Sequence, residues 1–228
     1  TGKGMFGYGT GNKGTFGPLP HPGGGVSGGI SIPLAGPGRD QGADPDPGAA
    51  LPPEEYDQPA PQVWVHKTAV VFPTAYLGAP CIIGPETEVR HCAFIRGSAL
   101  VGAHCVVGNS VELKNVILFD NVQTPHYNYV GDSILGYKSH MGAGSITSNV
   151  KSDKTLVTVK NGAERIETGR KKFGAILGDH VEVGCNSVLN PGTVVGRGSS
   201  IYPVSCVRGG HPGGQHRQTR GGLVVQRS

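Results

Sequence analysis

Large apolar residues recur at every sixth position through the middle of the chain. In the first run they are Val65, Val71, Leu77, Ile83, Val89, Ile95, Val101, Val107, Leu113 and Phe119. Four residues after each comes a second, mostly small residue: Ala69, Ala75, Cys81, Thr87, Ala93, Ala99, Cys105, Val111, Ile117 and Gln123. The large residues resume at Leu135, Met141, Leu177, Val183, Leu189, Val195, Ile201 and Val207.

A period of six fits neither an α-helix nor a simple alternating strand. It predicts coils of three short strands and three turns, about eighteen residues in each coil. The large residue fills the interior, the small one fits where the wall is tight, and stacked coils pair their backbones about 4.8 Å apart. The sequence therefore predicts an all-β fold, a parallel β-helix over residues 62–208, with another type of solenoid as the alternative.

The regions outside the repeat are rich in Gly and Pro or in charge. Residues 1–61 show no apolar period, which predicts a disordered tail, and residues 209–228 are expected to form an irregular C-terminal tail. Residues 149–175 interrupt the repeat, and Asn161-Gly162 between two β-prone segments predicts a hairpin with a type I′ turn.

The repeat also fails over Gln123–Ile134, where Pro, His, Tyr, Asn and Asp concentrate. An uninterrupted coil offers no recess, so chemistry is expected where the period breaks. Within the interruption over residues 149–175, residues 151–172 carry seven Lys and Arg against three acids. A polar cluster beside a basic loop indicates an anionic substrate.

Composition narrows the function further. The net charge of +4 comes from local basic patches without interleaved aromatics, so a nucleic-acid partner is not expected. No apolar run is long enough for a membrane helix, and the odd cysteine count without a CxxC pair favours a reducing cytoplasm with no metal site. We expect Cys81 and Cys105 to pack inside, and we expect the turn histidines to be solvated; these are His66, His91 and His104.

The stretch IRGSALVGAHCVVGNSVELKNVILFDNVQTPHYNYVGDSILGYKSHMGAGSITSNVKSDK resembles a known family. The repeat is similar to the left-handed β-helix of the hexapeptide-repeat transferases. More narrowly, it resembles the acetyltransferase domain of the bifunctional N-acetylglucosamine-1-phosphate uridyltransferase/glucosamine-1-phosphate acetyltransferases, without a gap from Arg96 to Asn149. The uridyltransferase half of those enzymes has no counterpart in this sequence.

The resemblance implies roles for individual residues. His126 matches the general base toward the sugar amine, and Ala143 matches the residue whose backbone N–H holds the developing oxyanion. The residues matching sugar-phosphate-binding positions are Arg96, Lys114 and Tyr129. An imidazole that is neutral near pH 7 suits the base, and a guanidinium and an ammonium suit the phosphate.

Other matched positions concern the acceptor and the acyl donor. Asn149 falls on an asparagine of the acceptor and acetyl-CoA site, and Lys154 lies one position from the family's loop lysine. His140 stands where the family has an acceptor-binding asparagine, and Cys185 replaces a serine of the acetyl-CoA site. The resemblance thus implies acetyl-CoA as co-substrate.

The expected function is acetyl transfer to a sugar phosphate or nucleotide sugar by a homotrimer with sites between subunits. The alternative is a non-catalytic β-helix that binds a sugar nucleotide or trimerises a nucleotidyltransferase. A hexapeptide-repeat carbonic anhydrase is disfavoured, because the histidine spacing for a zinc site is absent.

Overall fold

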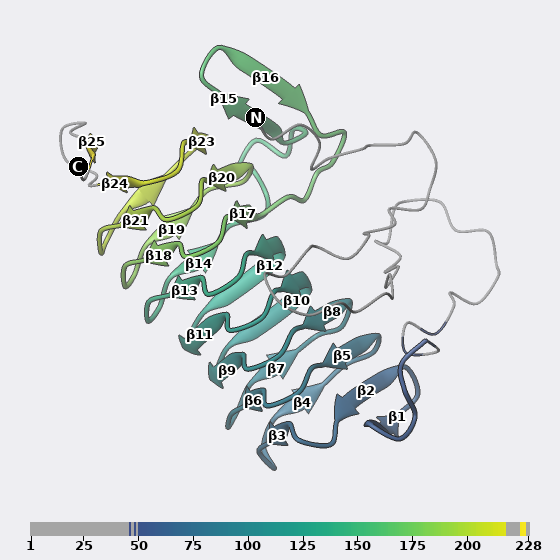
Figure 1. The fold of residues 1–228 in the computed structure, drawn as a ribbon. Coiled ribbons are helices and arrows are strands. Elements are labelled where there is room, and N and C mark those ends of the chain that lie inside the picture. The colour runs from purple at the N-terminus through teal and green to yellow at the C-terminus, as the bar shows by residue number, and fades with distance from the viewer. Residues whose placement is uncertain (1–45, 47, 49, 218–223, 227–228) are drawn as a thin grey trace.

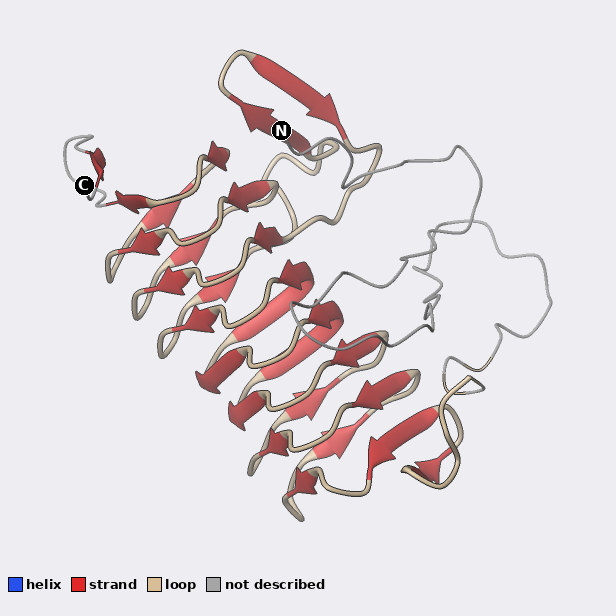
Figure 2. Ribbon diagram, viewed as in Figure 1, coloured by secondary structure: helices blue, strands red, loops and turns tan. Residues whose placement is uncertain are grey.

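The computed structural model describes residues 46, 48, 50–217 and 224–226. These residues form short strands joined by turns, and no helix occurs among them (Figure 2). The strands wind into coils stacked along one axis (Figure 1). The expected disorder of residues 1–45 and 218–223 lies outside the described residues.

Each coil contributes strands to three faces, which we name face A, face B and face C. Face A contains β4 (Tyr76–Leu77), β7 (Phe94–Ile95), the start of β10 (Glu112–Leu118), the start of β12 (Tyr129–Leu135), β14 (Ile146–Thr147), β19 (Val188–Leu189) and β22 (Cys206–Val207). Face B contains β3 (Val70–Val71), β6 (Glu88–Val89), β9 (Val106–Asn109), β11 (Gln123–His126), β13 (His140–Met141), β18 (Glu182–Val183), β21 (Ser200–Ile201) and β24 (Gln215–Arg217).

Face C contains β2 (Val63–His66), β5 (Cys81–Ile83), β8 (Ala99–Val101), the ends of β10 and β12, β17 (Ala175–Leu177), β20 (Thr193–Val195) and β23 (Gly210–His211). Strands within each face pair in parallel, which confirms the parallel β-helix predicted from the six-residue period. Two antiparallel pairs flank it: β1 (Tyr56–Ala60) pairs with β2, and β25 (Val224–Gln226) pairs with β24.

The interior is built from the residues that the period placed there. Ile83, Ile95, Leu113, Met141 and Leu189 are among the largest fully buried side chains. Most of the small positions are also buried, including Cys81 and Cys105, whose packing inside the coil is confirmed, whereas Ala69 and Ala75 are partly buried. Burial of these two thiols raises the pKa of each to about 12.

The register predicted around residue 119 is wrong by one position. Leu118 pairs with Val101 and is buried, whereas Phe119 is half-buried at the following corner. The inward small positions are likewise Val116 and Val122, rather than Ile117 and Gln123. The cause is a tight corner between faces A and C, where Asn115 adopts a left-handed φ of 55° and the chain turns with one residue fewer.

The same tight corner explains the apparent break over Gln123–Ile134. The coil continues through this segment, with Thr124 and Val130 completely buried where larger anchors stand elsewhere. A second tight turn at Asp132, with φ of 50°, again shortens the coil by one residue. The interpretation of this segment as an interruption is therefore wrong: the solenoid is continuous but its period changes.

The inserted segment after Asn149 forms the predicted hairpin, from β15 (Thr158–Asn161) and β16 (Glu164–Glu167). Its turn residues are Gly162 and Ala163, because Asn161 pairs with Glu164. Gly162 has φ of 59° at the first turn position, as in a type II′ turn, so the type I′ turn centred on Asn161-Gly162 is wrong. Strands lie beyond both expected domain limits, 62 and 208, and those limits stay a prediction.

Candidate functional site

Three of the predicted residues lie in one column at the corner between faces B and A. His126 ends β11, and its carbonyl accepts a hydrogen bond from the Gly144 N–H at 3.0 Å. The turn that carries Ala143 therefore lies on the next coil, directly beside His126. The Ala143 carbonyl in turn accepts from the Asn186 N–H at 2.8 Å, which places Cys185 one coil further.

The His126 imidazole is exposed at this corner. Its backbone N–H donates to Asn128 Oδ1 at 3.2 Å, and its ring centroid lies 6.3 Å from that of Tyr127. Asn128 is buried and donates from Nδ2 to the Gly142 carbonyl at 2.8 Å, which ties the two coils together. The backbone of His126 is thus fixed, while its ring makes no hydrogen bond within the described part of the chain and faces solvent.

The backbone N–H of Ala143 has no acceptor among the described residues. At another corner of the same coil, the equivalent N–H of Tyr137 donates to Asp179 Oδ1 at 3.0 Å. The residue that stands in the place of Asp179 beside Ala143 is Cys185, and its side chain accepts no hydrogen bond there. The Ala143 N–H is consequently available to a bound group that carries a hydrogen-bond acceptor.

Face A brings together the residues predicted to bind the sugar phosphate. Arg96 Nη1 lies 2.8 Å from Glu112 Oε1, and Lys114 is two residues beyond Glu112 on the same strand. Tyr129 pairs with Glu112 on the next coil. Its ring lies over Gly131, where a Cβ atom would come within 2.4 Å of the tyrosine oxygen, so a larger residue at position 131 would displace the ring.

A carboxylate at the tight corner connects Asn149 to this face. Asn115 Nδ2 donates to Asp132 Oδ1 at 2.7 Å, and Asn149 Nδ2 donates to the other carboxylate oxygen, Oδ2. Asn149 Nδ2 also donates to the Tyr129 hydroxyl at 3.1 Å. Burial and the nearby Asp132 charge raise the pKa of Tyr129, so its hydroxyl stays protonated at neutral pH.

Sequence reasoning did not assign a role to Asp132 or Asn115. Both adopt left-handed backbone conformations, which Asn and Asp tolerate better than most residues. The available signal was the spacing: a five-residue step between Leu113 and Leu118, with Asn in the middle, marks a tight corner.

Two predicted acceptor or donor residues lie away from face A. His140 is on face B, where its Nδ1 is 2.9 Å from Glu182 Oε2. Lys154 lies exposed in the inserted segment, and within the described residues no contact joins its side chain to face A. The phosphate-binding candidates and the His126 column therefore lie on or beside face A, whereas His140 and Lys154 lie away from it.

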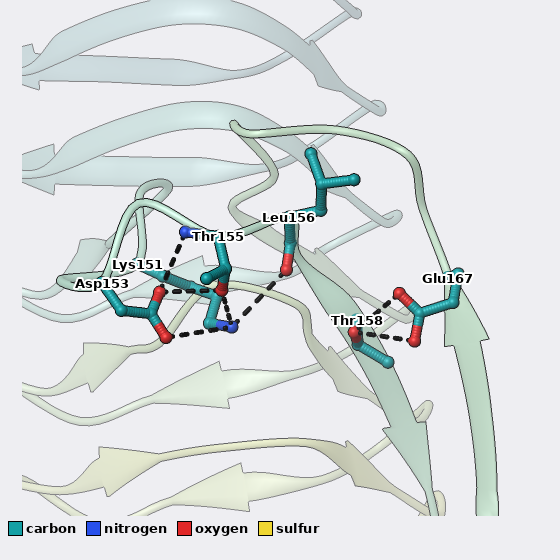
Figure 3. Close-up of polar contacts among 6 residues, drawn as sticks. All are labelled: Lys151, Asp153, Thr155, Leu156, Thr158 and Glu167. Atoms are coloured by element: carbon teal, nitrogen blue, oxygen red, sulfur yellow. Dashed lines mark hydrogen bonds and ion pairs between the residues drawn. The ribbon is translucent and has the colours of Figure 1, made fainter.

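The inserted loop holds its own shape through Lys151 (Figure 3). Lys151 Nζ lies 3.5 Å from Asp153 Oδ2 and also donates to Thr155 Oγ1. Thr155 donates to Asp153 from its backbone N–H at 3.0 Å and from its hydroxyl at 2.8 Å. These hydrogen bonds, more than the lysine charge, hold the pKa of Asp153 below its usual value.

No group of three potential metal ligands is found among the residues that the structure describes. In that same part of the chain there is no helix of the length and apolarity that crossing a membrane needs.

Comparison with known proteins gives both relatives and a family. The chain is 36% identical over 95 residues to a bifunctional sugar-1-phosphate nucleotidylyltransferase/acetyltransferase of Sulfurisphaera tokodaii, covering 42% of this chain and 24% of that protein. It is 34% identical over 133 residues to the bifunctional protein GlmU of Methanococcus vannielii, covering 58% and 29% respectively. The matched region thus spans less than a third of either relative.

Among solved structures, the N-acyltransferase AntD of Bacillus cereus aligns at 12% identity with a TM-score of 0.39, covering 73% of this chain and 82% of that one. A likeness of this size does not establish a shared fold, and the β-helix assignment depends on the strand pairing described above.

The family model described as the GMPPB C-terminal domain matches residues 80–199. That range contains both tight corners, the His126 column and the phosphate-binding candidates Arg96, Lys114 and Tyr129, and it covers more than half of the chain. The chain therefore belongs to the GMPPB C-terminal domain family.

Proposed function

We propose that the protein transfers an acetyl group from acetyl-CoA to an amino group of a sugar phosphate or nucleotide sugar. The observation that carries the proposal is the Ala143 N–H, which has no acceptor among the described residues and lies one coil from the exposed His126. An unengaged backbone donor beside a solvent-facing imidazole is the arrangement that thioester aminolysis needs. The name of one relative combines nucleotidyl transfer with acetyl transfer, and the other relative is named GlmU. Both names support the same reaction class.

In this reaction the amine nitrogen forms a bond to the thioester carbonyl carbon, and the carbon–sulfur bond breaks. His126 accepts the proton that the attacking amine loses and returns it to the leaving sulfur, so no covalent enzyme intermediate is required. The Ala143 N–H donates to the carbonyl oxygen, on which negative charge develops as the amine attacks.

The remaining residues bind rather than react. Arg96 and Lys114 would hold the acceptor phosphate, with the guanidinium already directed across face A by Glu112. The Tyr129 hydroxyl and the Asn149 carboxamide would contact the sugar. Asn149 and Cys185 are the candidates for the acetyl-CoA side, with His140 and Lys154 at the edge of the acceptor.

We also propose a homotrimer with sites completed between subunits. Face C presents a column of apolar residues on its outer side, half-buried except for the buried Ile82: Trp64, Ile82, Leu100, Ile117, Ile134, Ile176 and Val194. A continuous apolar stripe on a sheet face is characteristic of a buried contact. Light scattering should return about three times the chain mass of 23.5 kDa at micromolar concentration, and a monomer would contradict the assembly.

The test of the reaction is a matched pair of histidine variants. His91 lies in the same corner column two coils before His126, as the Asn109 Nδ2 bond to the His91 carbonyl at 3.1 Å and the pairing of Asn109 with His126 establish. Removing a general base costs about 10²–10⁴-fold in turnover. We expect His126→Ala to lower kcat by that factor with the acetyl-CoA KM unchanged, and His91→Ala to leave both unchanged.

The assay uses several amino sugars, their 1-phosphates and their nucleoside-diphosphate derivatives. Acyl transfer that survives His126→Ala within threefold would move the base elsewhere.

The family match also favours a second candidate, a binding or assembly module without catalysis, because the model describes a C-terminal domain. Thermal shift separates the two: stabilisation by acetyl-CoA supports the transferase, and stabilisation by sugar nucleotides alone supports the module.

A further inference from the structure

Two aromatic side chains stand exposed on face A, next to the residues proposed to bind phosphate. Tyr76 on β4 and Phe94 on β7 occupy paired positions on adjacent coils. Their ring centroids are 5.5 Å apart, and the residues are 59% and 44% exposed. The inward positions of these strands are filled by Leu77 and Ile95, so the two rings contribute nothing to the interior.

The aromatic pair, Tyr76 and Phe94, forms one column with the proposed acceptor site. Phe94 pairs with Glu112, and Glu112 pairs with Tyr129, so the outward order along face A is Tyr76, Phe94, Glu112 and Tyr129. Arg96 is two residues beyond Phe94, and its guanidinium reaches back to Glu112 at 2.8 Å. The chemistry along the face is therefore an aromatic pair, then the Arg96–Glu112 ion pair with Lys114 beside it, and then the hydroxyl of Tyr129 and the amide of Asn149.

That order matches the parts of a nucleoside-diphosphate sugar. Three steps between neighbouring strands, at about 4.8 Å each, give roughly 14 Å from Tyr76 to Tyr129. A sugar 1-phosphate needs only the part from Arg96 to Tyr129 and leaves the aromatic pair unused. A nucleoside diphosphate linked to the sugar extends past Arg96 in the direction of Phe94 and Tyr76, where its base meets two exposed aromatic rings tilted by 58° to each other.

We propose that Tyr76 and Phe94 form a stacking platform for the base of a nucleoside-diphosphate sugar, with Arg96 and Lys114 at its diphosphate. The inference deepens the proposed function, on which its assignment of the sugar end rests. Base–aromatic stacking is tolerant of base identity, because every base has a π-face. Beyond Tyr129 in the same column the outward residues are Ile146 and Val188, so the adjacent pair of aromatic rings lies on the side of Arg96 where a base would lie.

Isothermal titration calorimetry of the full chain with GDP, UDP and pyrophosphate tests the platform. We expect both nucleotides to bind about tenfold or more tightly than pyrophosphate, from stacking on the aromatic pair. Combined Tyr76→Ala and Phe94→Ala substitution should reduce nucleotide affinity to the pyrophosphate level and leave pyrophosphate affinity unchanged. Tyr76→Phe, which keeps the ring, should retain the wild-type preference.

Tyr202→Ala is the matched control, because Tyr202 is 46% exposed at the corner that follows face B. It should bind all three ligands as the wild type does. The proposal is overturned if the double variant keeps wild-type nucleotide affinity, or if nucleotides bind no more tightly than pyrophosphate. It is also overturned if the double substitution lowers the assembly mass, since the aromatic pair would then be a subunit contact.

Acyl-transfer assays on the same proteins separate this inference from the proposed function. Acetylation of an amino-sugar 1-phosphate together with nucleotide binding indifferent to the aromatic pair would overturn the platform alone. Nucleotide binding that depends on the pair, with no acyl transfer to any acceptor, would support the platform and reject the transferase.

Discussion

Two corners of one coil carry equivalent backbone N–H groups, of which one has a hydrogen-bond acceptor among the described residues and the other has none. At the corner between faces C and B, the Tyr137 N–H donates to the Asp179 carboxylate at 3.0 Å. At the corner between faces B and A, the equivalent Ala143 N–H faces Cys185 and has no acceptor within the described residues. The carboxylate satisfies the donor where only the fold is at stake, and a cysteine leaves it open beside His126.

The largest effect on kcat should come from giving the Ala143 N–H a hydrogen-bond acceptor within the protein. Cys185→Asp places at this corner the carboxylate that Asp179 provides at the other, so it should accept the Ala143 N–H and put negative charge where the oxyanion forms. Losing one oxyanion donor costs about 10²–10³-fold in kcat. Steady-state acetyl-transfer kinetics should therefore show at least a hundredfold loss.

Cys185→Ser is the matched control for that variant and should retain most of the turnover, because a hydroxyl brings no charge. Equal kcat values for Cys185→Asp and wild type would remove Ala143 from the chemistry.

The next effect concerns the corner between faces A and C, where the Asp132 carboxylate accepts hydrogen bonds from side chains instead of from a backbone N–H. Asp132→Gly keeps the left-handed φ of 50° accessible but removes both acceptors of the Asn115 and Asn149 amides. Hydrogen bonds to charged groups contribute about 1.5–3 kcal/mol. We expect the acceptor KM to rise about tenfold, with the acetyl-CoA KM changing less.

Asp132→Asn should restore the acceptor KM, because Asn115 can turn its amide over and accept from the new Nδ2, and the oxygen of residue 132 still accepts from Asn149. A tenfold rise in Asp132→Asn as well would mean that the charge, rather than the position of Asn149, matters.

A smaller effect is expected from leaving the Tyr137 N–H without its carboxylate acceptor. Asp179→Cys removes the acceptor of the Tyr137 N–H, far from His126. We expect the free energy of unfolding to fall by about 1 kcal/mol, typical of one hydrogen bond, with kcat unchanged. Urea denaturation and acetyl-transfer kinetics on the same preparation measure both quantities.

The smallest effect concerns the reactivity of thiols with iodoacetamide at pH 8. Cys185 is exposed, whereas burial raises the pKa of Cys81 and Cys105 to about 12 and keeps both protonated. Mass spectrometry should find Cys185 alkylated and the two buried residues unmodified. Acetyl-CoA should slow labelling of Cys185 a few-fold, and unchanged labelling would place the acyl donor elsewhere.

The sequence was sufficient for the parallel β-helix because the interior repeats one local rule. Ile83, Val101 and Leu189 each occupy an inward position that their spacing alone identifies. It was insufficient at the tight corners, because a one-residue turn at Asn115 changes the count without changing the composition. Phe119 was consequently placed inside, although Leu118 fills that position.

For the candidate site, the resemblance predicted His126, Ala143 and Cys185 but not their common column, which depends on the number of residues in each coil. The sequence also gave no indication that Cys185 stands where another corner has the accepting carboxylate of Asp179, since that comparison needs the hydrogen bond at that other corner.

Because each coil contacts chiefly its two neighbours, the molecule is nearly one-dimensional in its energetics. Opening begins where a coil has one neighbour instead of two, so hydrogen exchange should be fastest at β3 and β22 and slowest near β11 and β12. The tight corners and His126 lie in that slow middle section. Fraying at either end can then proceed without loosening the candidate site, which makes its geometry tolerant of variation in the terminal coils.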